Sequence, residues 1–253
     1  MRFDVITLFP EIFEAFLVSG VTRRAYESGQ VEVKLWNPRD YAQGNYRRVD
    51  DRPFGGGPGM VMMAEPLAAC LEAIRAERGQ DRHTAPLVLF SPIGTTLQHT
   101  MVQKWADSAG AVLLCGRYEG VDQRFIDQFV DQQISLGDFV MSGGEIAAMA
   151  LLDAVTRLQP GVLQDGDSSQ MDSFHPALDG LLDCPHYTRP EQWQGYGVPE
   201  ALLSGHHAQI ETWRRAQRLV LTQRLRPDLV DAARTAGLLT AQDETVLVQQ
   251  KSL

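Results

Sequence analysis

Residues 113–145 read LLCGRYEGVDQRFIDQFVDQQISLGDFVMSGGE, and the fold expected for this chain follows from them. The apolar run over 111–115 indicates a buried strand, which breaks into the glycine-containing string 116–120. A helix is expected over 121–130 and a short strand over 133–136, which leads into a second glycine-rich string. Two strands therefore each end in a glycine-rich loop that carries polar side chains.

The same alternation of strand and helix patterns extends over the first 160 residues. The patterns predict strands over 2–9, 31–36 and 86–90, and helices from Pro10 to Gly20 and over 64–78, 98–108 and 145–158. This order predicts an α/β fold with a mainly parallel sheet.

A third loop of the same type, Ser91 to Gly94, follows the strand over 86–90. In open α/β sheets such loops gather at the carboxyl edge of the strands, where ligands bind, and glycine lets the backbone approach a ligand closely. Strand-to-helix turns need glycine for structural reasons alone, so one loop would leave the question open. Three such loops favour a binding site.

The sequence predicts two domains. Residues 1–160 would form the α/β domain, and the polar stretch 161–176, rich in Asp, Ser and Gln, is typical of an inter-domain linker. Residues 177–253 carry mostly helical patterns and predict a small helical second domain.

Bulk composition is that of an ordinary globular protein, with 44% apolar and 22% charged residues. The three cysteines, Cys70, Cys115 and Cys184, lie far apart without CxxC spacing, which argues against a disulfide framework and a zinc site. The N-terminal residues do not form a signal peptide pattern, and no apolar run approaches the roughly 20 residues of a membrane span. These features predict a cytoplasmic protein.

The net charge of −9 weighs against nucleic-acid binding, but the charge is unevenly distributed. Residues 214–226 hold five arginines and no acidic residue, and residues 37–60 interleave arginines with tyrosines. The latter pattern suits phosphate contacts and base stacking. A solvated helix face and a surface loop are the default alternatives, and these patterns alone do not decide between them.

Several common catalytic signatures are missing from the sequence. It contains no GxGxxG after a strand, no GxxxxGK[ST] phosphate loop, no GxSxG elbow and no HExxH. By spacing alone, Asp172 is best interpreted as a turn former or helix cap, and Arg157 as a surface arginine near a helix C-terminus. Nothing in the pattern pairs these two residues.

Taken together, several strings resemble one family. The chain is similar, over nearly its whole length, to the bacterial tRNA (guanine-N1)-methyltransferases, the TrmD family of the SPOUT superfamily. The strings that carry the resemblance are Ile6–Pro10, Val49–Met60, Cys115–Gly120, Gly137–Glu145 and Leu182–Pro190.

The resemblance implies an N-terminal domain that binds S-adenosylmethionine in a deep trefoil knot, which periodicity could not have indicated. The three glycine-rich loops would form the knot. The implied cofactor-binding residues are Ser91, Pro92, Gly116, Tyr118, Leu136, Gly137, Asp138, Phe139, Val140, Met141, Gly143 and Gly144.

The resemblance also implies the reaction, methyl transfer to N1 of the guanine at tRNA position 37, just 3′ of the anticodon. Asp172 matches the family's general base, and Arg157 matches the arginine that stabilises the guanine. Glu119 is a candidate for guanine recognition. It is also a candidate for holding Mg²⁺, which the protein would bind in addition to S-adenosylmethionine. The family forms an obligate homodimer in which each active site contains both chains, and the linker and C-terminal domain bind tRNA.

Two departures from the family pattern stand out. Gly205-His206-His207 replaces a Gly-Asn-His string, and the segment from Ser173 to Gly180 is longer than usual. Independently of these departures, two alternatives to this reaction stay open: a knotted methyltransferase that acts on another RNA position, such as a ribose 2′-hydroxyl, and a non-catalytic tRNA-binding protein.

Overall fold

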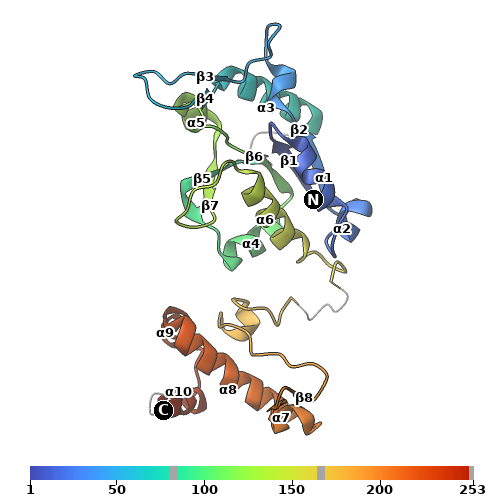
Figure 1. The fold of residues 1–253 in the computed structure, drawn as a ribbon, viewed down its shortest axis with the longest axis vertical. Helices are drawn as coiled ribbons and strands as arrows, with labels where there is room; N and C mark the ends of the chain where they lie inside the picture. The colour runs from blue at the N-terminus through green and yellow to red at the C-terminus, as the bar shows by residue number, and fades with distance from the viewer. Residues whose placement is uncertain (80–84, 164–168, 251–253) are drawn as a thin grey trace. The chain divides into compact units, whose positions relative to one another are not determined.

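The computed structural model describes residues 1–79, 85–163 and 169–250. The chain forms two compact units, Met1–Gln164 and Asp165–Leu253 (Figure 1). Of the helices in the described part of the chain, none combines the length and the apolar character that crossing a bilayer requires.

The first unit contains a five-stranded parallel sheet with strand order β2-β1-β6-β5-β7. The strands are β1 (Arg2–Ile6), β2 (Glu32–Trp36), β5 (Leu87–Thr96), β6 (Gly110–Leu114) and β7 (Gln132–Ser135). The α/β fold with a parallel sheet is therefore confirmed. The central strand β6 is buried along its whole length, which explains why its sequence is a continuous apolar run.

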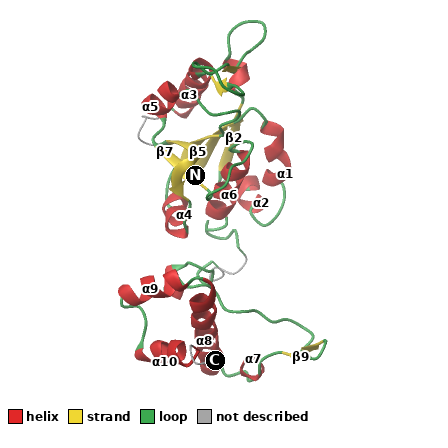
Figure 2. Ribbon diagram, turned by 60° about the vertical axis from the view of Figure 1, so that its left-hand side comes forward, coloured by secondary structure: helices red, strands yellow, loops and turns green. Residues whose placement is uncertain are grey.

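Helices cover both faces of this sheet (Figure 2). Alternate residues of β6 point to opposite faces, so Leu113 packs in one core and Leu114 in the other. The first core is shared with α1 (Glu14–Leu17), α2 (Arg23–Glu27), α4 (His99–Ala106) and α6 (Glu145–Thr156). The second is shared with α3 (Ala64–Arg78) and α5 (Gln123–Phe129).

The N-terminal elements are shorter than predicted. Strand β1 ends at Ile6 instead of Phe9, because the backbone turns and the Phe9 N–H donates to Thr7 Oγ1. The helix expected from Pro10 is a 3-10 turn, η1 (Pro10–Phe13), followed by the single turn α1.

We expected Ser91 to Gly94 to form a loop beyond the strand. These residues lie instead within β5. The pairing register between β5 and β7 shifts between Phe90 and Thr95, so these four residues bulge from the ladder. Gly94 is needed there, because a Cβ at this position would lie 2.5 Å from the Gln133 carbonyl carbon.

The long stretch 37–60 is partly ordered by short elements. It contains the 3-10 helix η2 (Pro38–Tyr41) and the strand β3 (Asp50–Asp51), which pairs with β4 (Val61–Met62). This two-stranded ladder closes the glycine-rich loop between them and brings its ends together.

The second unit is mainly helical, as predicted. It consists of η4 (Pro176–Leu178), the hairpin β8 (Gln192–Trp193) and β9 (Tyr196–Gly197), and helices α7 (Glu200–Leu203), α8 (His207–Leu225), α9 (Pro227–Thr235) and α10 (Ala241–Gln250). The core contains Leu181, Leu219, Val230, Ala233 and Leu247. The linker predicted over 161–176 includes residues 164–168, which lie outside the described residues, so it stays a prediction.

Candidate active site

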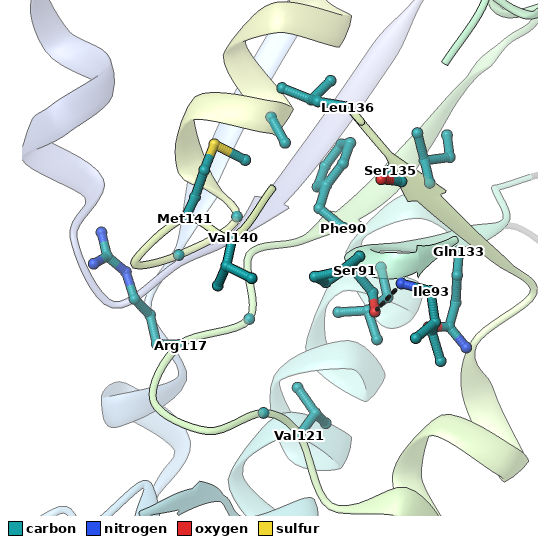
Figure 3. Close-up of a pocket in the computed structure, with 18 of the residues that line it drawn as sticks. Phe90, Ser91, Ile93, Arg117, Val121, Gln133, Ser135, Leu136, Val140 and Met141 are labelled. Atoms are coloured by element: carbon teal, nitrogen blue, oxygen red, sulfur yellow. Dashed lines mark hydrogen bonds between the residues drawn. The ribbon is translucent and has the colours of Figure 1, made fainter. Parts of the chain in front are cut away.

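A pocket of about 330 Å³ lies at the carboxyl edge of β5, β6 and β7. Most of its walls come from residues 89–93, 116–121, 133–136 and 139–144, and Gln123, Ile126 and Ala147 complete the lining (Figure 3). The volume is in the range of small-molecule sites, and most of the lining side chains are apolar.

Ten of the twelve implied cofactor-binding residues line this pocket. They are Ser91, Pro92, Gly116, Tyr118, Leu136, Phe139, Val140, Met141, Gly143 and Gly144. Gly137 and Asp138 stand between lining residues without lining the pocket themselves. Glu119, implied as a guanine-recognition residue, is also part of the wall.

Two of the wall segments are in direct backbone contact. The Gly144 N–H donates to the Gly116 carbonyl at 3.0 Å, and Arg117 forms a β-bridge with Gly143. A Cβ on Gly144 would lie 2.8 Å from Cys115 Cα, and one on Gly143 would lie 2.2 Å from Arg117 Nε. Glycine is therefore required by close packing here, and the pocket wall depends on it.

Arg117 is held by a buried carboxylate behind the pocket. Glu145, which is buried at the N-terminus of α6, accepts hydrogen bonds from Arg117 Nε at 3.1 Å and from Thr7 Oγ1 at 2.9 Å. The Arg117 guanidinium also lies 4.5 Å from the centre of the Phe9 ring. These contacts fix a cation in the pocket wall.

The loop of residues 52–60 reaches the pocket through Glu119. The Glu119 N–H donates to the Met60 carbonyl at 2.9 Å. A Cβ on Gly59 would lie 2.4 Å from Glu119 Oε1, so Gly59 makes room for this carboxylate. The glycine-rich string that carried the resemblance is thus packed against the proposed guanine-recognition residue.

The neighbouring Tyr118 adopts a positive φ of 61° and accepts a hydrogen bond from Arg39 Nη2 at 3.4 Å. Burial and the nearby Asp50 carboxylate raise the pKa of Tyr118, so its hydroxyl stays protonated and neutral at neutral pH. Burial likewise raises the pKa of the Cys115 thiol at the start of this loop, which leaves it an unreactive core residue.

Arg157 lies away from the pocket of its own chain. It caps the C-terminal end of α6, whereas Gly144, at the N-terminal end, lines the pocket. The helix has 12 residues. At 1.5 Å per residue, the two ends are about 18 Å apart.

Asp172 belongs to the second unit, where it begins a turn and its carbonyl accepts from the His175 N–H at 3.2 Å. Asp172 and Arg157 thus belong to separate units.

The arginines of α8 are only partly available to a nucleic acid. Arg218 is buried, with Nε 3.5 Å from Asp183 Oδ1, and Arg215 pairs with Asp179 and Asp243. Arg214, by contrast, is half-buried with 40% of its side chain exposed, and it pairs with Glu211, so it remains a candidate for phosphate contacts.

The sequence-based residue set missed some of the wall. Arg117, Val121, Gln133 and Ile93 line the pocket as well. Arg117 could have been found, because it stands between Gly116 and Tyr118 in the quoted string. Gln133 carries no such signal, since only the pairing of β7 with β5 brings it to the pocket.

No group of three or more His, Cys, Asp or Glu side chains with metal-binding geometry occurs among residues 1–79, 85–163 and 169–250. Among the lining residues that the structure describes, Glu119 supplies the one carboxylate.

A parallel α/β sheet with a glycine-walled pocket at the carboxyl ends of its strands defines a class of enzymes and binding proteins for nucleotide-like ligands. The sequence profile of the family described as tRNA (Guanine-1)-methyltransferase TrmD matches residues 1–232, and the chain belongs to this family. The family methylates guanine 37 of tRNA, with S-adenosylmethionine as the methyl donor.

Several curated proteins are similar over all or nearly all of their length. A protein of Paracidovorax citrulli named tRNA (guanine-N(1)-)-methyltransferase is 73% identical over 254 residues, which cover 100% of both chains. One of the same name from Polaromonas sp. is 74% identical over 98% of this chain and 96% of its own. Another, from Cupriavidus necator, is 56% identical over 98% of this chain and 94% of its own.

Proposed function

We propose that this chain transfers the methyl group of S-adenosylmethionine to N1 of guanine 37 in tRNA, with Asp172 as general base, Arg157 as the cation that stabilises the guanine, and Glu119 as the residue that recognises it. The observation that supports this most directly is the pocket, because ten residues implied by resemblance converge on one cavity.

The lining of the pocket fits S-adenosylmethionine. Apolar side chains such as Leu136 and Val140 offer surfaces for an adenine ring, and Gly116, Gly143 and Gly144 bring bare backbone to the wall of the pocket. When bound, the cofactor supplies an electrophilic methyl group on a sulfonium.

The chemistry on the tRNA side requires a base. Guanine N1 carries a proton at neutral pH and becomes a nucleophile once that proton is removed. The Asp172 carboxylate would accept the proton, and the guanidinium of Arg157 would stabilise the charge that builds on O6. Glu119 would accept hydrogen bonds from the guanine edge.

We also propose a homodimer with composite active sites. The position of Arg157 supports this, since about 18 Å of helix separates it from the pocket of its own chain. A second copy could bring its Arg157 or Asp172 to the pocket. Exposed apolar side chains of the first unit, such as Val18 and Ile146, are candidates for the surface that this copy would cover.

Four further parts of the proposal concern a metal ion, tRNA binding, the knot and the location of the protein. Glu119 would be the ligand of Mg²⁺ where the ion takes part, since Mg²⁺ is often held by one carboxylate together with water and substrate. The linker over 161–176 and the domain over 177–253 would bind tRNA, and the loops around the pocket would form the trefoil knot. The three free cysteines fit a cytoplasmic location.

The experiment that tests the function measures methyl transfer from radiolabelled S-adenosylmethionine to two unmodified tRNA transcripts, one with guanine and one with adenine at position 37. Label on the guanine transcript alone is expected. Label on both would remove the site assignment and leave a methyltransferase for another RNA position. No label on either transcript, with Mg²⁺ present and tRNA bound, would point to a non-catalytic binding protein.

The role of Asp172 is tested by Asp172→Ala. This variant is expected to lose methyl transfer and keep cofactor binding, because the carboxylate belongs to the second unit and not to the pocket wall. Loss of cofactor binding in calorimetry would contradict the assignment of Asp172 as a base.

A further inference from the structure

The segment that carries Asp172 is a closed loop of residues 172–183, named here the Asp172 loop. Its two ends are joined at the neck, where the Phe174 N–H donates to the Leu181 carbonyl at 2.9 Å and the Asp183 N–H donates to Ser173 Oγ at 2.9 Å. Asp172 directly precedes Ser173 and Phe174, the residues that close this neck, so the geometry of the loop bears on the position of the proposed base.

The base of the loop is attached to the C-terminal half of α8. Leu181 is fully buried in the core of the second unit, and the Leu182 N–H donates to Thr222 Oγ1 at 3.1 Å. Asp183 lies 3.5 Å from the buried Arg218.

The far side of the loop is attached through an arginine. Arg215 of α8 donates from Nη1 to Asp179 Oδ2 at 2.5 Å, and from Nε and Nη2 to the two oxygens of Asp243 at 3.0 Å each. Asp243 belongs to α10, and its Oδ2 also accepts from the Thr240 N–H at 2.8 Å. One guanidinium therefore joins the Asp172 loop to two helices.

The backbone on this side of the loop adopts an unfavourable conformation. Asp179 has a positive φ of 56°, which is uncommon for a residue other than glycine, and the adjacent Gly180 also has a positive φ. A closed loop still has many conformations to exclude, so an anchor on the side opposite its neck restricts it further.

We propose that Arg215 is a positioning residue for methyl transfer: through Asp179 and Asp243 it holds the Asp172 loop, and with it the Asp172 carboxylate, in the geometry that the reaction needs. The inference rests on the proposed role of Asp172. It assigns Arg215, from the arginine-rich helix that the sequence suggested for RNA contacts, to the support of the base.

The test compares Arg215→Ala, Arg215→Lys and Asp172→Ala with the unaltered chain in single-turnover methyl transfer at saturating tRNA, from pH 7 to pH 9.5. At pH 7 the rate constant of Arg215→Ala is expected to fall about 10- to 100-fold, as for a small misplacement of a catalytic group. Arg215→Lys keeps the charge but lacks the branched guanidinium that reaches two carboxylates. Its rate constant is expected to lie between those of Arg215→Ala and the unaltered chain.

The pH dependence separates positioning from a loss of structure. As the pH rises, guanine N1 loses its proton to solvent and needs the base less. The rate ratio of Arg215→Ala to the unaltered chain should therefore rise towards one, with unchanged cofactor affinity. The same deficit at every pH, or weaker cofactor binding, would overturn the proposal.

Arg234→Ala is the matched control, because Arg234 lies outside the arginine-rich segment 214–226 and its exposed pair with Glu244 joins α9 to α10, as Arg215 joins α8 to α10. It is expected to leave the rate unchanged at all pH values, and an equal loss in this control would also overturn the proposal. If Asp172→Ala retains full activity, the proposed base is wrong. If Asp172→Ala is inactive while Arg215→Ala has the normal rate, the base stands and only the positioning role fails.

Discussion

At the scale of single residues, the pocket wall depends on a few positions where a side chain would collide with a functional group. Gly59 is the most informative, because a Cβ added there would lie 2.4 Å from an oxygen of the Glu119 carboxylate. Gly56 provides a comparison, since it also has a positive φ but a Cβ there would meet nothing within 4 Å.

Gly59→Ala is therefore expected to displace Glu119 and to reduce methyl transfer to guanine by up to about 100-fold, while cofactor binding persists. Gly56→Ala should cost a similar backbone strain and leave the rate nearly unchanged. Single-turnover rates and calorimetric cofactor affinity check this. Equal rates for the two variants would mean that Glu119 does not act where we place it.

Gly137 is restricted by its conformation. Its φ is 150°, and a Cβ would lie 3.2 Å from the Phe139 ring, which lines the pocket. Gly137→Val is expected to distort this wall and abolish cofactor binding, whereas Gly29→Val, at a positive φ with open space around it, should not. An unchanged heat of S-adenosylmethionine binding in Gly137→Val would refute the prediction.

At the scale of elements, the second unit is held together by charges as well as by its apolar core. Hydrogen bonds from Arg215, and further ones from Thr240, lower the pKa of Asp243 to about 2. Asp243 is 4% exposed, so solvent screens its pair with Arg215 little. Helix α10 therefore depends on an ionised carboxylate.

A carboxyl group whose folded-state pKa is lowered contributes stability above its unfolded-state pKa, near 4, and loses it as the pH falls towards 2. The shift corresponds to roughly 2 kcal/mol. Asp243→Asn should thus be less stable than the unaltered chain at pH 6, and the difference should shrink between pH 4 and pH 2. Urea unfolding followed by helix ellipticity at each pH measures it, and a constant difference would refute the prediction.

At the scale of the whole molecule, the parts of the proposed site are spread over two units and over both ends of α6. Asp172 lies in the second unit, and the pocket lies in the first. If a site combines the pocket of one chain with Asp172 of another, two inactive variants can complement each other.

Mixing Gly137→Val with Asp172→Ala, followed by subunit exchange, should restore activity to about a quarter of the sites, because half of the dimers are mixed and each has one intact site. Each variant alone should be inactive. Activity that never recovers on mixing, although mass spectrometry detects mixed dimers, would show that Asp172 acts on the pocket of its own chain.

The sequence alone was sufficient for the parallel α/β fold and for α3 to the residue, and the family resemblance named part of the pocket wall. The reason is physical: strands buried on both faces must be continuously apolar, and close backbone approaches must be glycine, so both leave a visible pattern. The strings quoted for the family resemblance contain these same glycines. The family match confirmed the resemblance.

Tertiary structure decided what local pattern could not. Ser91 to Gly94 lie within β5 because this strand pairs with β7 again after the bulge. Gln133 lines the pocket only because β7 pairs with β5. Arg215, which the sequence suggested for RNA contacts, is instead paired with Asp179 and Asp243. Such contacts join residues far apart in the chain, and periodicity and spacing describe only neighbours along it.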